Sequence, residues 1–522
     1  MSFSKKSLPL IFLFLTFLSH KLNAQDNPIQ LRAAIHLNST VSDGEYTLTQ
    51  ITQTAQDTGI SVVIFTDRDL MRWEYGLWPL RNIVKKRVER NSVFTYGLNR
   101  YLKEIESLQD KFSDMVLIPG VESAPFYYWQ GSFISCISNY LYQKDKLAYR
   151  LLSGRKKSLL NLAPLCMRNW HIHILAIGLK EYGDYKNLPV VGNTQALRDK
   201  FSIYMLWPIL AFILGLRVVK NNLYCYATSP RRWHWKVCSK GRFIFGVVIT
   251  LVGILFTINN WPFFRSKFDQ YHSGPKDLPL PYQNYIDYVN RLEGLTFWSH
   301  PEAENIGELD NIMFETQKHS RLLLDTKDYT GFNFFPEGSR EIGSVGGMWD
   351  MILGAYCQGL RSKPIWAIGG LGFERGDLKR SMENMQTVIL VYEKNKQAVL
   401  KAMKEGKMYI VTGKDSLDFL LEEFCISDES GQVKGYMGDS VNIEGRTLLL
   451  IRGDFLKYRK DIELKIIKNG DIIKTFTVQT PFRIIYLDEE IVQNKSYYRI
   501  EITGKDVYLV TNPIFVSRKV YR

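Results

Sequence analysis

Residues 35–44 read IHLNSTVSDG, and this short stretch decides how the N-terminal half of the chain folds. It ends the apolar run LRAAIH, which is typical of a buried strand. Positions i and i+2 of a strand point to the same side, so His36 and Asn38 are expected to project together. Asp43 follows after a short loop. The stretch therefore suggests a metal site, although Asn38 stands where a second histidine would be the better ligand.

The same arrangement recurs along the chain, as an apolar strand that carries a polar, ligand-type residue. The strands SVVIFTD, DMVLIPGVES, NWHIHILAIGL and GLTFWSHPEA carry or precede Arg68, Glu122, His173 and His300. We expect each of these residues at the C-terminal end of its strand, where barrels of βα units have their sites.

A helix is expected between the first two strands. In SDGEYTLTQITQTAQDTG, Leu48, Ile51 and Ala55 fall on one face at helical spacing, and Ser42 or Asp43 could supply the N-cap. This alternation of strands and helices predicts an α/β fold.

At these residues the sequence resembles the PHP superfamily, the polymerase and histidinol phosphatase-like metal-dependent phosphoesterases. The family motifs run HxH, SDG, TDH, GxE, a histidine before an aliphatic pair, a histidine before proline, and DxH. In that order the chain offers His36, Ser42-Asp43-Gly44, Thr66-Asp67, Gly120-Val121-Glu122, His173 and His300-Pro301. The resemblance covers most of residues 30–375 and implies a distorted (β/α)7 barrel. Further on, Thr511-Asn512-Pro513-Ile514 resembles the closing strand of members with a C-terminal β-domain.

The chain departs from the family at three motifs. Asn38 replaces the second histidine of HxH, Arg68 replaces the histidine of TDH, and IWAIGGLGFE (365–374) offers no ligand where DxH is expected. The family cluster holds two or three metals, so these losses imply a reduced site with one divalent ion (zinc, manganese or iron) or none. The residues that the resemblance assigns to metal are His36, Asp43, Glu122, His173 and His300.

Arg68 is the most informative of these departures. A guanidinium stays protonated in proteins and cannot bind metal, and its charge repels a dication placed nearby. It can instead hold an anion through two hydrogen bonds. We expect Arg68 and Asn38 to contact the phosphate of a small phosphorylated or other anionic ligand. The alternative is a surface arginine that forms an ordinary ion pair with Asp67 or Asp69.

The N-terminus predicts export. Lys5 and Lys6 precede the apolar run LPLIFLFLTFL, and the small residue Ala24 precedes a polar stretch. This layout is that of a secretory signal peptide over residues 1–24, with an uncleaved anchor as the alternative.

Two further apolar segments predict a transmembrane hairpin. Residues 201–216 and 243–264 are uncharged, and the loop 217–242 between them carries seven Lys and Arg and no acid. The second segment reaches the roughly 20 residues that span a bilayer, and the first does so if Val218 and Val219 extend it. By the positive-inside rule the loop is cytoplasmic, which leaves both large domains extracytoplasmic, in the periplasm. The alternative is a pair of buried core helices.

The bulk composition fits several domains rather than one. A chain of 522 residues predicts two or three units, and 45% apolar residues suffice for packed cores. The net charge of +14 does not indicate nucleic acid, because much of it lies in the loop 217–242 and no nucleic-acid fingerprint occurs. The expected units are a signal peptide (1–24), a barrel in two parts (28–200 and 265–385), the hairpin (201–264), a connecting α/β segment (386–434) and a β-sandwich (435–522).

These observations leave two interpretations of function open. In the first, the chain is a membrane-anchored extracytoplasmic phosphoesterase with a reduced metal site. In the second, it is a pseudoenzyme, a binding or sensing module that recognises an anionic ligand without catalysis. A structural role beside another envelope protein is compatible with the lost ligands, but no motif favours it.

Overall fold

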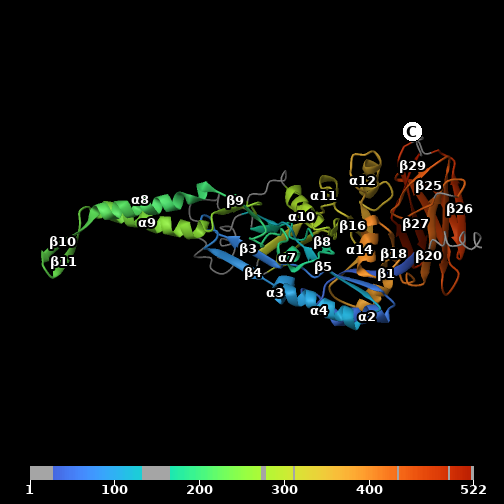
Figure 1. The fold of residues 1–522 in the computed structure, drawn as a ribbon, viewed down its shortest axis with the longest axis horizontal. Coiled ribbons are helices and arrows are strands. Elements are labelled where there is room, and N and C mark those ends of the chain that lie inside the picture. The colour runs from blue at the N-terminus through green and yellow to red at the C-terminus, as the bar shows by residue number, and fades with distance from the viewer. Residues whose placement is uncertain are drawn as a thin grey trace, which may run out of the picture.

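The computed structural model describes residues 28–131, 165–271, 278–309, 312–431, 434–491 and 494–518. The expected signal peptide lies outside the described residues. The molecule is elongated, with a helical hairpin at one end, a barrel in the middle and a β-sandwich at the other end (Figure 1).

Seven strands form a closed barrel. They are β1 (Ile29–Leu37), β2 (Val62–Phe65), β5 (Val116–Ser123), β8 (Ile174–Ile177), β13 (Leu295–Trp298), β16 (Gly331–Phe335) and β17 (Trp366–Phe373), paired in this order. A parallel pairing of β17 with β1 closes the ring. The predicted α/β class and the seven-stranded barrel are confirmed.

One strand of the barrel runs against the others. β8 pairs antiparallel with both β5 and β13, whereas the other neighbours in the ring are parallel. The expectation that every candidate residue follows its strand is therefore wrong for His173, which precedes β8. Because β8 is reversed, its N-terminal end lies at the same end of the barrel as the C-terminal ends of its neighbours. His173, just before β8, thus lies at the same end of the barrel as the candidate residues that follow their strands.

Helices cover the barrel and bury an apolar stripe against it. The longer ones are α2 (Leu48–Asp57), α4 (Leu98–Lys111), α10 (Pro279–Arg291), α12 (Met348–Cys357) and α14 (Lys396–Glu405). α2 buries Leu48, Ile51 and Ala55 as predicted, but its N-cap is Thr47, in a capping box with Gln50. Ser42 and Asp43, the expected caps, lie further upstream and serve the site described below.

The β-sandwich grows directly out of the barrel. The N-terminal half of β1 pairs antiparallel with β18 (Met385–Val391), and this sheet continues through β19 (Met408–Thr412). It then runs through β28 (Val507–Thr511), β27 (Ser496–Gly504), β24 (Asp461–Lys468) and β25 (Asp471–Gln479), with β29 (Ile514–Arg518) and β22 (Ser440–Ile443) attached. The second sheet has the order β21 (Lys434–Tyr436), β20 (Phe419–Ser427), β23 (Thr447–Phe455), β26 (Phe482–Asp488). The segment 386–434, expected as a connection, thus supplies strands to both sheets.

A buried arginine ties the two domains together. Arg499 of β27 is fully buried and donates from Nε and Nη2 to the two carboxylate oxygens of Asp350 on α12, at 3.0 and 2.8 Å. Its Nη1 donates to Glu501 at 2.6 Å. The Asn512 side chain accepts a hydrogen bond from Ala367 N in β17 and donates to the carbonyls of Ala367 and of Met408 in β19. These contacts fix the sandwich against the barrel.

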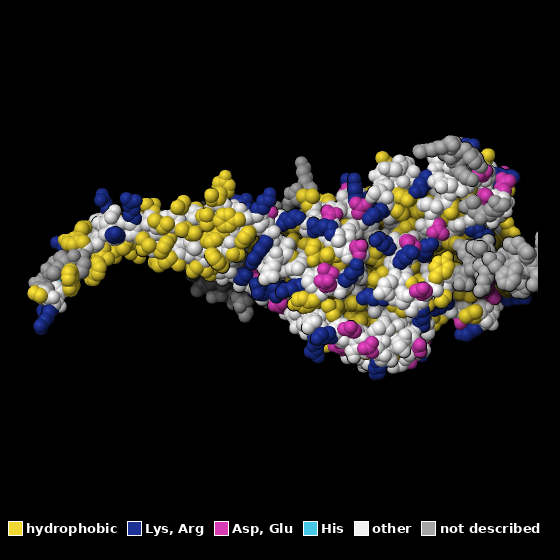
Figure 2. All heavy atoms as spheres, in the orientation of Figure 1, with side chains coloured by type: hydrophobic (Ala, Val, Ile, Leu, Met, Phe, Trp, Pro, Cys, Tyr) yellow, Lys and Arg dark blue, Asp and Glu magenta, His cyan; other side chains and the backbone are white. Residues whose placement is uncertain are grey.

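The hairpin consists of two long, apolar helices. α8 (Trp207–Asn222) extends the turn η2 (Ile203–Leu206) and includes Val218 and Val219; α9 (Lys240–Asn260) returns. The segments Ile203–Asn222 and Lys240–Asn260 have 20 and 21 residues and mean hydropathies of 1.7 and 2.2, and either is long enough to cross a membrane. Only 11% of each apolar window is buried, so a pair of buried core helices is excluded. Figure 2 shows the apolar side chains covering the hairpin.

Short strands join the barrel mouth to the base of the hairpin. β3 (Arg72–Gly76) pairs with β4 (Lys85–Glu89), and β9 (Arg198–Phe201) pairs with β12 (Phe264–Ser266) on the two chain ends that enter and leave the hairpin. A further sheet has the order β14 (Asn305–Leu309), β15 (Ile312–Thr316), β7 (Cys166–Arg168), β6 (Tyr128–Gln130). At the far tip, β10 (Leu223–Ser229) and β11 (Arg232–Val237) connect α8 to α9.

Candidate metal centre at the barrel mouth

Three imidazoles converge on one carboxylate oxygen at the mouth of the barrel. Glu122 Oε1 lies 3.1 Å from His36 Nε2, 3.0 Å from His173 Nδ1 and 3.8 Å from His300 Nε2. His173 Nδ1 also lies 3.0 Å from His300 Nε2. These residues come from β1, β5, the start of β8 and the end of β13, so the closed barrel brings together positions far apart in the sequence.

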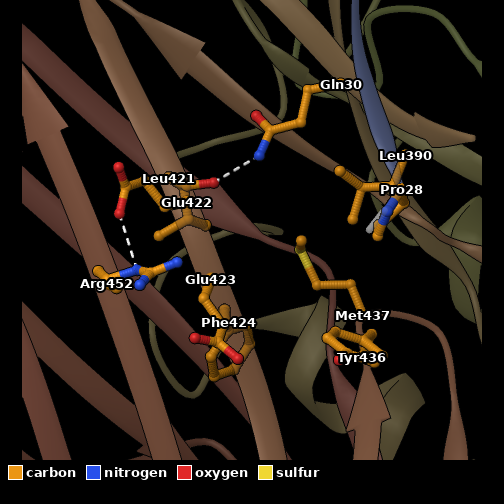
Figure 3. A pocket seen from close by; sticks show the side chains of 10 residues that line it. All are labelled: Pro28, Gln30, Leu390, Leu421, Glu422, Glu423, Phe424, Tyr436, Met437 and Arg452. Carbon is orange, nitrogen blue, oxygen red and sulfur yellow. Dashed lines mark hydrogen bonds and ion pairs between the residues drawn. The ribbon is translucent and has the colours of Figure 1, made fainter. Parts of the chain in front are cut away.

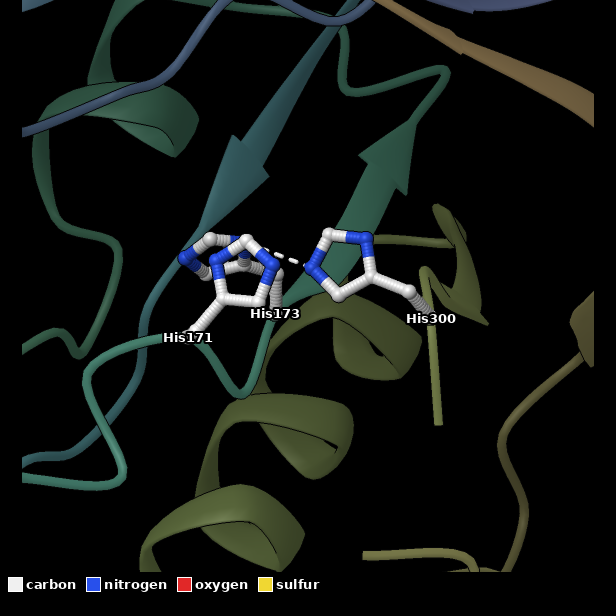
Figure 4. A group of neighbouring side chains, drawn as sticks. All are labelled: His171, His173 and His300. Carbon is white, nitrogen blue, oxygen red and sulfur yellow. Dashed lines mark hydrogen bonds between the residues drawn. The ribbon is translucent and has the colours of Figure 1, made fainter. Parts of the chain in front are cut away.

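A fourth histidine completes this side of the site. The ring of His171 stacks on that of His300, with centroids 4.2 Å apart and an interplanar angle of 9°. Figure 4 shows the His173 and His300 rings turned toward each other, with His171 beside them. The nitrogens of His171, His173 and His300 form one compact group of potential ligands, and His36, Glu122 and His300 form a second.

His36 is held at an irregular point of its strand. Its φ is 65°, in the left-handed region, and the pairings of β1 with β2 and with β17 both shift register between Ile35 and Leu37. Such a conformation is costly for a residue with a side chain and is concentrated at functional sites. Despite the bulge, His36 and Asn38 reach the same carboxylate, because Asn38 Nδ2 lies 3.5 Å from Glu122 Oε2.

Arg68 occupies the other side of Glu122. Only 8% of the residue is exposed. Its Nε donates to Asp43 at 2.7 Å, its Nη2 donates to Glu374 at 2.7 Å, and its Nη1 lies 3.5 Å from Glu122 Oε2. Nη1 also lies 3.0 Å from His173 Nδ1. The alternative of a surface arginine paired with Asp67 or Asp69 is therefore wrong.

The aspartate beside Arg68 has a structural role. Asp67 is buried and accepts hydrogen bonds from Ser39 N at 2.7 Å, from Ser39 Oγ at 2.9 Å and from Ser42 Oγ at 2.7 Å. It thereby fixes the loop after β1, which carries Asp43 to Arg68. The Ser-Asp-Gly motif thus serves the site through loop geometry as well as through its carboxylate.

The charges at the mouth favour a cation over an anion. Three carboxylates, those of Asp43, Glu122 and Glu374, face the single guanidinium of Arg68. Burial alone raises the pKa of the Glu122 carboxyl, but Arg68, His173 and His36 outweigh it and hold that pKa well below its usual range. Burial lowers the pKa of His173 and, more strongly, of His300. Their neutral imidazoles are the form that binds metal.

The donor set fits one transition-metal ion. In both groups of potential ligands the donor atoms lie within 4.8 Å of one another. One group offers three imidazole nitrogens, and the other offers two imidazole nitrogens and a carboxylate oxygen; either set of three ligands suits zinc and its neighbours. The buried atoms His36 Nδ1 and Asn38 Oδ1 have no hydrogen-bond partner among the described residues, so a polar atom is available both beside the imidazoles and beside Arg68.

The barrel brings all seven predicted site residues to one place, in two groups. His36, Glu122, His173 and His300 form the imidazole group. Asp43 and Asn38 lie on the Arg68 side, joined by an Asn38 Nδ2 to Asp43 Oδ1 hydrogen bond of 3.2 Å. Sequence reasoning missed His171 and Glu374. Glu374 directly follows β17, the same strand-end position that marked the others, but it does not fit the DxH pattern expected there.

A pocket elsewhere in the described part of the chain is unrelated to this chemistry. It has a volume of about 260 Å³ and lies where β1 meets the sandwich, between Gln30 and Arg452 (Figure 3). Gln30 Nε2 donates to the Leu421 carbonyl across it at 2.7 Å. No candidate site residue lines this pocket.

The fold and the cluster define an α/β-barrel protein with a His/Glu group that could hold a metal ion. No family model matches the chain, and no curated protein matches it. Among solved structures it is similar to a two-domain protein from Bacteroides vulgatus ATCC 8482, described as containing a predicted PHP-like metal-dependent phosphoesterase. The identity is 11% and the TM-score 0.34, over 94% of this chain and 96% of that chain. At this level the match carries no argument, so the assignment of the barrel rests on its strand order.

Proposed function

We propose that this chain is a membrane-anchored, PHP-like phosphoesterase that works with a single divalent ion. The observation that carries the proposal is the convergence of His36 Nε2, His173 Nδ1 and His300 Nε2 on Glu122 Oε1. These four residues would hold the ion. When bound, such an ion lowers the pKa of a water molecule and makes it a nucleophile for ester hydrolysis.

Arg68 has two roles in this proposal. It neutralises part of the charge of Asp43, Glu122 and Glu374, and it keeps Glu122 ionised and positioned toward the imidazoles. It also supplies the contact to a substrate phosphate. Glu374 is the most exposed of its three partners, with 40% of the side chain accessible, so an incoming phosphate displaces Glu374 from Nη2. Asn38 lies beside Glu122 and Asp43 and contributes its amide to the same anion.

The hairpin supplies the membrane anchor. Both helices present apolar side chains outward, and exposed tryptophans flank them, Trp207 and Trp261 at the barrel end and Trp233 and Trp235 at the tip. Aromatic side chains gather in this way at the two interfaces of a bilayer. The basic loop 217–242 faces the cytoplasm in this proposal, and the barrel and sandwich lie in the periplasm. Cys238 at the tip is exposed, so a variant that retains only this cysteine tests the orientation with a membrane-impermeant maleimide.

Metal content of the purified, detergent-solubilised protein tests the proposed site. We expect about one transition-metal ion per chain in the wild type and none in Glu122→Gln. Glu341→Gln is the matched control, because Glu341 is a surface residue paired with Lys318. Hydrolysis of phosphomonoesters and phosphodiesters by wild type and control, but not by Glu122→Gln, supports the reaction class.

A non-catalytic role is the second candidate, and the position of Arg68 favours it. A guanidinium paired with three carboxylates already stabilises the mouth without any ion. Absence of metal from both wild type and Glu122→Gln, with both proteins folded, would support a binding module rather than an enzyme.

A further inference from the structure

The barrel-side end of the hairpin carries a set of basic residues that the candidate site does not use. The β3–β4 hairpin leaves the barrel mouth four residues after Arg68 and reaches the end of α9. There, Asn82 N donates to Asn259 Oδ1 at 3.0 Å and Asn82 Nδ2 donates to the Asn259 carbonyl at 2.7 Å. The loop 77–84 is therefore fixed beside the base of the hairpin.

Positive charge is concentrated around this base. The segment 72–90 has six Lys and Arg against two Glu. Glu74 is paired with Lys85 and Arg87, and Glu89 with Arg72. Lys86 points to the other face of β4, since side chains alternate along a strand.

Two more cations come from the strands that enter and leave the hairpin. Lys200 lies in β9 and Arg265 in β12, and both are exposed. Lys86, Lys200 and Arg265 have no ion-pair partner among the described residues. We refer to these three residues as the basic collar. Figure 2 shows Lys and Arg gathered where the apolar hairpin meets the barrel.

Large apolar side chains lie next to the collar and face outward. Trp78 and Tyr204 are each 79% exposed and Trp261 is 69% exposed. A band of aromatic residues beside basic ones is the composition of protein surface that meets the headgroup region of a membrane.

We propose that the basic collar binds the phosphate headgroups of anionic phospholipids in the leaflet next to the barrel. The inference rests on the proposed insertion of α8 and α9, because only then do Lys86, Lys200 and Arg265 lie at headgroup depth. Three unpaired cations next to an apolar, aromatic band match the charge and the chemistry of such a surface. Binding there holds the β3–β4 hairpin on the membrane, and with it the side of the barrel that carries the mouth.

Lipid retention by the full-length protein tests the collar. The protein is reconstituted into vesicles of equimolar phosphatidylcholine and phosphatidylglycerol, extracted in a neutral detergent, and its bound lipids are counted by native mass spectrometry. We expect the wild type to retain phosphatidylglycerol in preference to phosphatidylcholine. In a variant with Lys86→Gln, Lys200→Gln and Arg265→Gln this preference falls strongly, because each cation near an anionic surface contributes a factor of about five in binding.

The matched control removes the same number of exposed cations from the sandwich, as Arg459→Gln, Lys474→Gln and Arg483→Gln, and keeps the preference of the wild type. Equal retention by the collar variant and the wild type overturns the proposal, as does a wild type without preference. Alkaline carbonate extraction of the same membranes reports on insertion independently. Release of the protein by carbonate would refute the proposed membrane anchor. Resistance to carbonate without a lipid preference would refute only the proposed lipid binding by the basic collar.

Discussion

Replacement of Arg68 by alanine is expected to convert its place into a second cation site. The change removes the guanidinium that pairs with Asp43, Glu122 and Glu374, whose oxygens lie 2.7, 3.5 and 2.7 Å from it. It leaves three carboxylates around a space, with the unpartnered Asn38 Oδ1 beside them. Oxygen donors of this kind suit Mn²⁺.

The magnitude follows from the burial of the cluster. Glu122 is 1% exposed, and removal of one partner from a buried ion pair costs about 3–5 kcal/mol of stability. Binding of a divalent ion, at a concentration about a hundred times its Kd, offsets about 2.7 kcal/mol of this loss in stability. The metal-free variant is thus expected to melt well below the wild type and to recover much of the difference when Mn²⁺ is added.

Equilibrium dialysis against Mn²⁺ with elemental analysis gives the stoichiometry, and thermal melts with and without Mn²⁺ give the stability. We expect one ion per wild-type chain and two per Arg68→Ala chain. Arg72→Ala, which removes a partly exposed arginine from its pair with Glu89, is the control and keeps one ion. A folded Arg68→Ala protein with wild-type stoichiometry and a Mn²⁺-independent melt would refute the view that the guanidinium fills a cation position.

Three further changes test other parts of the molecule. Arg499→Ala strips a buried carboxylate of its partner between barrel and sandwich and is expected to cost about 3–5 kcal/mol in denaturant unfolding, whereas Arg452→Ala on the surface costs under about 1 kcal/mol. Burial lowers the pKa of His319 to about 3, so its imidazole binds a proton more readily in the unfolded chain. The free energy of unfolding therefore falls as the pH drops below about 6.5, by up to about 1.4 kcal/mol per pH unit. In thermal melts from pH 4 to 7, His319→Gln is expected to reduce this slope. Gly253→Ile places atoms against the backbone of α8, where an added Cβ already meets a backbone nitrogen at 2.5 Å, and is expected to separate the two helices in a cysteine cross-linking assay; Gly241→Ile, in open space, is not.

Sequence patterns were sufficient for the elements that depend on local chemistry. Apolar runs that carry or adjoin polar residues identified most of the barrel strands. The Asn469-Gly470 dipeptide is likewise typical of a two-residue hairpin turn, and both residues have positive φ between β24 and β25. The direction of β8 could not be predicted, because an apolar run reads the same in a parallel and an antiparallel strand. His173 was therefore assigned correctly to the mouth but at the wrong end of its strand.

The partners of Arg68 were beyond sequence reasoning for a related reason. The residue type excluded a metal ligand, but which carboxylates meet the guanidinium depends on how β1, β2, β5 and β17 close into a ring. Glu374 lies 306 positions away along the chain. Its carboxylate followed an apolar strand, yet no short-range pattern connects it to Arg68. A substrate phosphate would consequently have to compete with the Glu374 carboxylate for Arg68.

The antiparallel pairing of β8 with β13 has a consequence for how the protein is made. The two strands are neighbours in the barrel, yet the whole α8–α9 hairpin lies between them in the chain. β1, β2, β5 and β8 are synthesised and, in this proposal, exported first, and an open sheet of these strands would have a free edge that can pair with other chains. If α8 and α9 enter the membrane as proposed, the remaining strands arrive only after that insertion. A chain whose hairpin fails to insert would thus expose an incomplete barrel to chaperones and proteases. Insertion of the hairpin would therefore precede assembly of the candidate site.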